Sequence, residues 1–272
     1  MPKKIKIGIV GCGAIGSSLA KTISRQFTKQ ASLTALYDID NQKSVKLSRI
    51  LAKNLSVKNL GQVINKSDLV IESASAASSW NIAKSVLGKG RSIMIMSVGG
   101  VVSHYPQLCN LARRHNAKAY IPSGAISGVD ALKAAGMNKI RKVILTTRKH
   151  PLSFKGVKYV ESRYPGLKDI KKDKVLFFGP AASAVKYFPQ NINVAAVLSI
   201  AGIGQDKTLV KIIASASVKK NTHEIHIESE AATIFTRTEN LLHPDNPKTS
   251  YLAVLSAAAT LKQILHQVKV GT

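Results

Sequence analysis

The chain has 272 residues, 45% of them hydrophobic, which is enough for one large domain or two modest ones. No apolar run could cross a bilayer, no signal peptide is evident, and Cys12 and Cys109 fit neither a disulfide framework nor a metal site, so we expect a cytoplasmic protein without a bound metal. The 40 basic and 14 acidic residues give a net charge of +26, but the basic residues are scattered without a basic tail or interleaved aromatics, which argues against nucleic acid as a partner.

Up to about residue 122, short β-branched runs alternate with longer helical segments, a pattern typical of βαβ units on a parallel sheet. We expect strands at 5–10, 32–37, 68–72, 92–97 and 117–121, and helices near 14–26, 41–53, 77–88 and 103–115. The pattern predicts an α/β fold in which residues 1–122 form a Rossmann-type doubly wound domain.

After Pro122 the pattern changes to that of an α+β domain over residues 123–246. We expect strands at 142–147, 208–215, 223–228 and 233–239, a buried alanine-rich helix at 191–201, and mostly loop at 151–176. The last segment is apolar at helical spacing, and we expect 247–272 to form a helix that packs back on the first domain. The sheet of the second domain favours a homodimer.

The glycine loop, residues 11–16, follows the first predicted strand and opens the first predicted helix. Gly11 permits a tight turn, Gly13 lets backbone amides approach a pyrophosphate, and Gly16 allows close packing of helix on strand. The predicted nucleotide contacts are Gly11, Cys12, Gly13, Ala14, Ile15 and Gly16. For Cys12, a small tolerated side chain is a simpler explanation than a redox-sensitive thiol.

Asp38 closes the second predicted strand, where dinucleotide-binding domains place the acid that binds the adenosine ribose. Its charge would repel a 2′-phosphate, which favours NAD, although the positive surface leaves NADP as an alternative. An aspartate that merely ends the strand is the other explanation. Ser73, Ala74 and Ser75, and the loop at 97–100, also follow strand ends, where they fit either a dinucleotide or ordinary turns.

The residues of segment 221–228 (NTHEIHIE) alternate, so His223 shares one strand face with Ile225 and Ile227, and His226 lies on the other. If the isoleucines mark the covered face, the pKa of His223 can be tuned and His226 is solvated. On the pattern alone, a hydrogen-bonded core histidine is the more common explanation.

Segment 245–250 (DNPKTS) stands where the last helix is expected to begin. A helix amino end that carries Lys248, Thr249 and Ser250 would hold a carboxylate. Simple capping by Asn246 or Thr249 is the alternative.

With these residues the chain resembles the L-aspartate dehydrogenase family over nearly its whole length. The stretches that carry the resemblance are GCGAIG at 11–16, IPSGAISGVDALKAA at 121–135, LTTRK at 145–149, FPQNINVAAVLSIAG at 188–202, NTHEI at 221–225 and NPKTSYLAVLSA at 246–257. Two departures are Pro180, where a serine is usual, and the run ESEAA at 228–232 in place of the family's acidic or glycine-rich strand.

The resemblance implies NAD(P)-dependent oxidative deamination of L-aspartate to iminoaspartate, which hydrolyses to oxaloacetate and ammonia and feeds NAD biosynthesis. It also implies that His223 is catalytic and that Ala125 and Asn193 contact the nucleotide. We expect His223 to act as a general base with a near-neutral pKa, and Lys248, Thr249 and Ser250 to hold a carboxylate of the dicarboxylic amino acid.

Two alternatives stay open at this point. One is another amino- or oxo-acid dehydrogenase or reductase of this architecture, of the homoserine or dihydrodipicolinate type. The other is a nucleotide-sensing or nucleic-acid-binding protein that has kept the fold without the chemistry.

Overall fold

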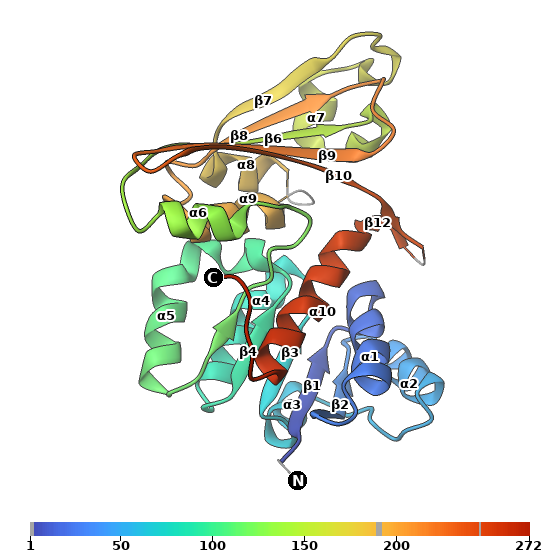
Figure 1. Ribbon diagram of the computed structural model, residues 1–272. Coiled ribbons are helices and arrows are strands. Elements are labelled where there is room, and N and C mark those ends of the chain that lie inside the picture. Colours follow the sequence, from blue (N-terminus) through green and yellow to red (C-terminus); the bar gives the residue numbers. More distant parts are fainter. Residues whose placement is uncertain (1–2, 189–191, 245) are drawn as a thin grey trace. The chain divides into compact units, whose positions relative to one another are not determined.

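The computed structural model describes residues 3–188, 192–244 and 246–272, and it falls into two compact units (Figure 1). The first unit comprises the chain up to Pro122 together with Val254–Val270, and the second comprises Ser123–Ala253 with Gly271 and Thr272. None of the helices in these described ranges has the length and apolar character needed to cross a membrane.

The first unit is built on five parallel strands in the order β2-β1-β3-β4-β5. They are β1 (Ile5–Val10), β2 (Ala31–Tyr37), β3 (Leu69–Glu72), β4 (Ser92–Ile95) and β5 (Ala119–Tyr120). Beyond β2, the Leu36 N–H donates to the Leu55 carbonyl at 2.8 Å and the Val57 N–H donates to the Leu36 carbonyl at 2.9 Å, so residues 55–57 extend the sheet. The resulting strand order is that of a Rossmann fold, with the switch point between β1 and β3.

The helices of this unit are α1 (Ala14–Gln26), α2 (Asn41–Ile50), α3 (Leu60–Lys66), α4 (Ala76–Leu87) and α5 (Tyr105–Arg114), with the short 3-10 helices η1 (Val98–Gly100) and η2 (Val102–His104). The predicted doubly wound fold is confirmed. The sequence prediction missed α3, although Asn59 marks its start by accepting a hydrogen bond from the Gln62 N–H at 3.0 Å.

The last helix, α10 (Tyr251–Leu265), packs into the first unit, as predicted. Its residues Ala257 and Leu261 are fully buried in the same hydrophobic core as Leu19 and Ile23 of α1. The predicted start of this helix is wrong, because residues 246–250 form the strand β12 (Asn246–Ser250), paired with β11 (Leu242–His243). A proline at position 247 favours extended backbone in the residue before it, which explains the later helix start.

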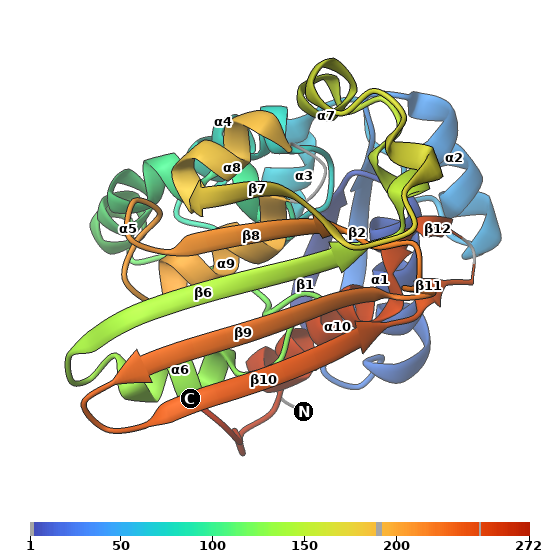
Figure 2. The ribbon, with the colours of Figure 1, turned by 90° about the horizontal axis from the view of Figure 1, so that it is seen from above.

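The second unit contains a mixed sheet in the order β10-β9-β6-β8-β7. Its strands are β6 (Ile140–Lys149), β7 (Lys174–Pro180), β8 (Leu209–Ala214), β9 (Asn221–Ser229) and β10 (Thr233–Asn240), and only the β6–β8 pair is parallel. The helices α6 (Val129–Ala135), α8 (Ala181–Tyr187) and α9 (Ile192–Ala201) lie on one face, whereas Figure 2 looks onto the other face and shows its strands open to view. The predicted α+β character is confirmed.

The segment predicted as mostly loop is more ordered than expected. It contains the helix α7 (Lys158–Arg163), the 3-10 helices η3 (Pro151–Phe154) and η4 (Leu167–Asp169), and the start of β7. The aromatic rings of Phe154, Tyr159, Phe177 and Phe188 pack against one another there. The packing of these rings stabilises ordered structure in a segment whose lysines, prolines and glycines predicted a loop. Local composition does not reveal this packing.

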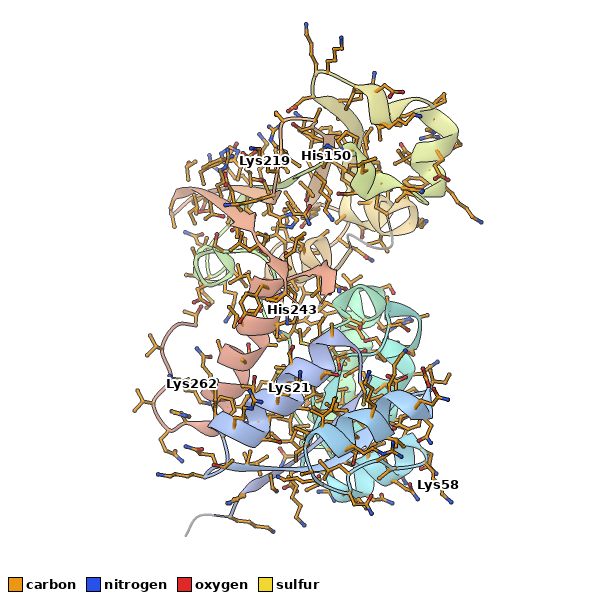
Figure 3. The ribbon with its side chains drawn as sticks, turned by 90° about the vertical axis from the view of Figure 1, so that its right-hand side faces the viewer. Lys21, Lys58, His150, Lys219, His243 and Lys262 are labelled. Atoms are coloured by element: carbon orange, nitrogen blue, oxygen red, sulfur yellow. The ribbon has the colours of Figure 1, made fainter. Side chains whose placement is uncertain are left out.

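The positive charge is spread over both units. Lys58 and Lys262 in the first unit and Lys219 in the second, all labelled in Figure 3, have exposed side chains. Their separate positions agree with the scattered basic residues of the sequence.

Candidate active site

Each glycine of the glycine loop meets a different steric demand. Gly11 has φ +94°, and a Cβ there would stand 2.4 Å from the Ser73 carbonyl oxygen, so both its conformation and its surroundings require glycine. A Cβ on Gly16 would stand 1.9 Å from the Gly11 carbonyl oxygen. By contrast, the same test at Gly13 finds nothing within 4 Å. Two glycines therefore serve packing, and Gly13 leaves space beside the backbone.

The amino end of α1 faces that space, and no side chain caps its first amides. Gly13 is the N-cap residue, and the first turn contains no acidic residue. The first amides of a helix carry a partial positive charge and point toward an anion. The residues present therefore fit the pyrophosphate of a dinucleotide, with Ala14 and Ile15 in the first helical turn.

Asp38 lies directly after β2, at the predicted position, and is half-buried. Its Oδ2 accepts the Cys12 N–H at 2.7 Å and its Oδ1 accepts the Asp40 N–H at 2.9 Å. These bonds tie the end of β2 to the glycine loop and leave each oxygen with further lone pairs for ribose hydroxyls. Burial and the charge of Asp38 raise the pKa of the Cys12 thiol to about 12, which argues against a reactive thiolate.

Glu72, which the sequence analysis did not single out, connects two loops beside the glycine loop. It is fully buried at the end of β3. Its carboxylate accepts the Ala74 N–H at 2.9 Å, the Ser97 N–H at 3.0 Å and the Ser79 hydroxyl at 3.1 Å. Burial raises the pKa of Glu72, whereas these hydrogen bonds oppose that rise. An acidic residue ending a short apolar strand was the available signal.

The two loops that follow β3 and β4 differ in what their small residues do. Ser73 donates its hydroxyl to the Gly11 carbonyl at 2.8 Å, and Ala74 and Ser75 are exposed just before α4. In the other loop, a Cβ on Gly100 would stand 2.0 Å from the Ala76 carbonyl oxygen, so this glycine serves packing. The first loop keeps exposed residues next to the glycine loop.

In the second unit, His223 is buried on the helix-covered face of its sheet, with an exposed fraction of 6%. Ile225 and Ile227 share its face and are buried, while His226 is half-exposed, as the alternation predicted. His223 pairs directly with Thr147 of β6, and the His223 Nδ1 lies 3.0 Å from the Thr147 Oγ1. Thr147 therefore fixes the orientation of the imidazole ring, leaving Nε2 as the second ring nitrogen.

The expected near-neutral pKa of His223 is wrong for the free chain. Burial, together with the positive charge of Lys149, lowers the pKa of His223 to about 3. Burial also lowers the pKa of Lys149 to about 8. Neither Thr147 nor Lys149 was singled out from the sequence, although both lie in the LTTRK stretch and alternate onto one strand face.

The two residues that the resemblance assigns to the nucleotide lie in the second unit. The buried Ala125 accepts a hydrogen bond through its carbonyl from Nδ2 of Asn240, the last residue of β10, at 3.0 Å. Asn193 is exposed in the first turn of α9. Their contact with a nucleotide stays a prediction.

The predicted helix cradle for a carboxylate is not present, because Lys248, Thr249 and Ser250 belong to strand β12 and α10 begins only at Tyr251. Thr249 and Ser250 are half-buried, and the side chain of Lys248 lies outside the described part of the structure. The simple helix cap suggested for Asn246 or Thr249 is wrong for the same reason. Any role of these residues in binding substrate would come from a strand.

Comparisons with known proteins cover both units. A family model described as "Homoserine dehydrogenase, NAD binding domain" matches residues 11–122, and one described as "Aspartate dehydrogenase, C-terminal" matches residues 130–264. L-aspartate dehydrogenases of Methanosarcina barkeri and Methanosarcina acetivorans are 42% and 45% identical to the chain over 271 residues, 98% of this chain and 100% of each relative. Aspartate dehydrogenase from Thermotoga maritima shares the fold, with a TM-score of 0.77 and 24% identity over 99% of this chain and 100% of that one.

An open glycine loop on a Rossmann sheet and a buried, hydrogen-bonded histidine on a second sheet define this chain as a pyridine-nucleotide-dependent oxidoreductase. Its full-length identity to the curated relatives narrows the class. The chain belongs to the L-aspartate dehydrogenase family.

Proposed function

We propose that the chain catalyses the NAD(P)-dependent oxidative deamination of L-aspartate to iminoaspartate, which water hydrolyses to oxaloacetate and ammonia. The observation that carries the proposal is His223, buried and hydrogen-bonded to Thr147 within a chain that belongs to the L-aspartate dehydrogenase family. We further propose, from the resemblance, that the product feeds NAD biosynthesis.

His223 is the proposed general base. The bound nicotinamide supplies the hydride acceptor. With the Nδ1–H donating to the Thr147 oxygen, the lone pair on Nε2 takes a proton from the substrate ammonium or from the water that attacks the imine. Thr147 acts as a positioning residue because its hydrogen bond to Nδ1 holds the imidazole ring in place. The neutral form of His223 that burial favours is the form that can accept a proton.

The glycine loop, Ser73 to Ser75, Ala125 and Asn193 are the proposed nucleotide contacts. NAD is the proposed preferred cofactor over NADP, because the Asp38 carboxylate can accept hydrogen bonds from ribose hydroxyls and would repel a phosphate on the ribose. Lys248, Thr249 and Ser250 stay weaker candidates for holding substrate.

A homodimer is proposed through the open face of the second sheet (Figure 2). Phe178 and Phe235, exposed by 58% and 65%, occupy that face, beside the ion pair of Arg148 with Glu224 at 3.5 Å. Large apolar side chains on an open sheet face favour a self-complementary interface. Sedimentation at micromolar concentration should give a dimer that Phe235→Lys dissociates, and a wild-type monomer would contradict this.

The cytoplasmic location also stays a prediction.

A panel of amino acids assayed with NAD and with NADP tests the proposed function. L-aspartate should be oxidised with NAD in preference to homoserine, alanine, glutamate and asparagine. Turnover of homoserine without turnover of aspartate would favour the homoserine-type alternative. The absence of turnover with every amino acid would favour the non-catalytic alternative.

A further inference from the structure

Glu72 is a buried carboxylate without a cation beside it. Its side chain is fully buried at the end of β3, and none of the ion pairs among the described residues includes it. The Ala74 N–H donates to its Oε1, and the Ser97 N–H and the Ser79 hydroxyl donate to its Oε2. Because a backbone N–H can only donate, both oxygens of Glu72 serve as acceptors. This bonding pattern is typical of an ionised carboxylate.

The negative charge of Glu72 is costly in the free chain. Burial raises the pKa of Glu72, and its hydrogen bonds offset only part of that rise. Buried charges in proteins are usually paired with an opposite charge or a metal ion, so an unpaired one needs a physical reason. There are two possible reasons. The hydrogen bonds could serve only to fix the loops after β3 and β4, or the charge could act on a bound cation.

The position of Glu72 in the sheet favours the second reason. The parallel strands stand in the order β2, β1, β3, β4, so their carboxyl ends share one edge (Figure 1). A dinucleotide lies across such an edge, with its pyrophosphate at the loop after β1. Asp38, which follows β2, is the proposed contact of the adenosine half, so the nicotinamide half would extend the other way, over the ends of β3 and β4. Glu72 joins these two ends, because Ala74 follows β3 and Ser97 follows β4.

We propose that the charge of Glu72 makes the nicotinamide half of the site bind the oxidised, cationic ring in preference to the reduced, neutral ring. This inference rests on the proposed function, because it needs a nicotinamide cofactor, and it adds the residue that sets the relative affinity of the two cofactor forms. The oxidised ring carries one positive charge and the reduced ring carries none, so a buried carboxylate attracts only the oxidised form. Solvent ions screen a buried charge only weakly. The chain would therefore bind NAD⁺ firmly and release NADH readily.

The test compares the Kd for NAD⁺ with the Kd for NADH, by fluorescence titration with NADH and by competition with NAD⁺. Glu72→Gln keeps the size of the side chain and removes its charge. The ratio of the Kd for NAD⁺ to the Kd for NADH should rise roughly 4- to 16-fold, the effect of one unit charge acting over about 10–20 Å at an effective dielectric constant of about 20. Glu72→Asp keeps the charge and disturbs the hydrogen bonds, so both Kd values should rise by similar factors and their ratio should stay the same.

Asp68→Asn is the matched control, because Asp68 precedes β3 at the opposite end of the strand, where it pairs with Arg91 at 3.6 Å. This variant should keep the wild-type ratio. An unchanged ratio in Glu72→Gln, or equal changes in Glu72→Gln and Asp68→Asn, would overturn the inference and leave only the role of fixing the two loops. The wild type should bind NAD⁺ at least as tightly as NADH, and a preference for NADH of more than about tenfold would overturn the inference whether or not the variants fold. A wild type that binds both cofactor forms but does not oxidise aspartate would overturn the proposed function alone.

Discussion

Replacing Gly13 by alanine should separate dinucleotide binding from folding. Gly13 has φ −70° and ψ −162°, extended backbone that alanine adopts readily, and its added Cβ would meet nothing within 4 Å. Because the free chain accommodates the methyl group, the free energy of unfolding should stay the same or rise by about 0.4–1 kcal/mol through the lower entropy of the unfolded chain.

The same methyl group would stand where the pyrophosphate is proposed to approach the amides of α1. Inserting a methyl group into a filled site costs about 1–3 kcal/mol, so the Kd for NADH should rise roughly 5- to 150-fold. Gly16→Ala should instead lower the free energy of unfolding, because its Cβ would stand 1.9 Å from the Gly11 carbonyl oxygen and the backbone must move.

Denaturant unfolding without nucleotide and fluorescence titration with NADH measure the two effects separately. Gly13→Ala should bind NADH more weakly while its free energy of unfolding stays at or above that of the wild type. Gly16→Ala should have a lower free energy of unfolding than the wild type. If Gly13→Ala bound NADH as tightly as the wild type, the open space beside Gly13 would not be the nucleotide site. If it unfolded as easily as Gly16→Ala, the steric comparison would be wrong.

His223→Ala should bind NADH normally and lose turnover about 10²- to 10⁴-fold, the usual contribution of general acid–base catalysis, and unchanged turnover of aspartate would remove this histidine from the reaction. Thr147→Val should lower kcat and, by leaving a buried ring nitrogen without its partner, lower the free energy of unfolding by about 1–3 kcal/mol, whereas Thr147→Ser should retain both. Asp38→Ala should shift the ratio of kcat/KM for NAD over that for NADP toward NADP by roughly tenfold, and an unchanged ratio would show that Asp38 does not select the cofactor.

The cofactor half of the protein could be predicted because its signals are local. The glycine loop, the strand before it and the helix after it lie within about one βαβ unit of sequence, and Asp38 follows at the spacing that this unit sets. Glu72 was missed because its signal is not local: its partners include the Ser97 amide in the loop after β4, which only the folded sheet brings near.

The other half depends on contacts between distant segments. Strand alternation correctly assigned His223 to the covered face, but its partner Thr147 is 76 positions away and meets it only through the register of β6 with β9. The prediction of a helix at Lys248 was wrong because it used apolar spacing alone. It did not take into account that the residue before Pro247 favours extended backbone. Sequence patterns thus identified which residues are buried, and the pairing of strands decided which of them meet.

This pairing leaves the proposed base buried and weak in the free chain. Burial is the larger cause of the low pKa of His223, about 3, and the positive charge of Lys149 adds to it. His223 is therefore neutral at any pH at which the protein would work, and its protonated form is the one that burial disfavours.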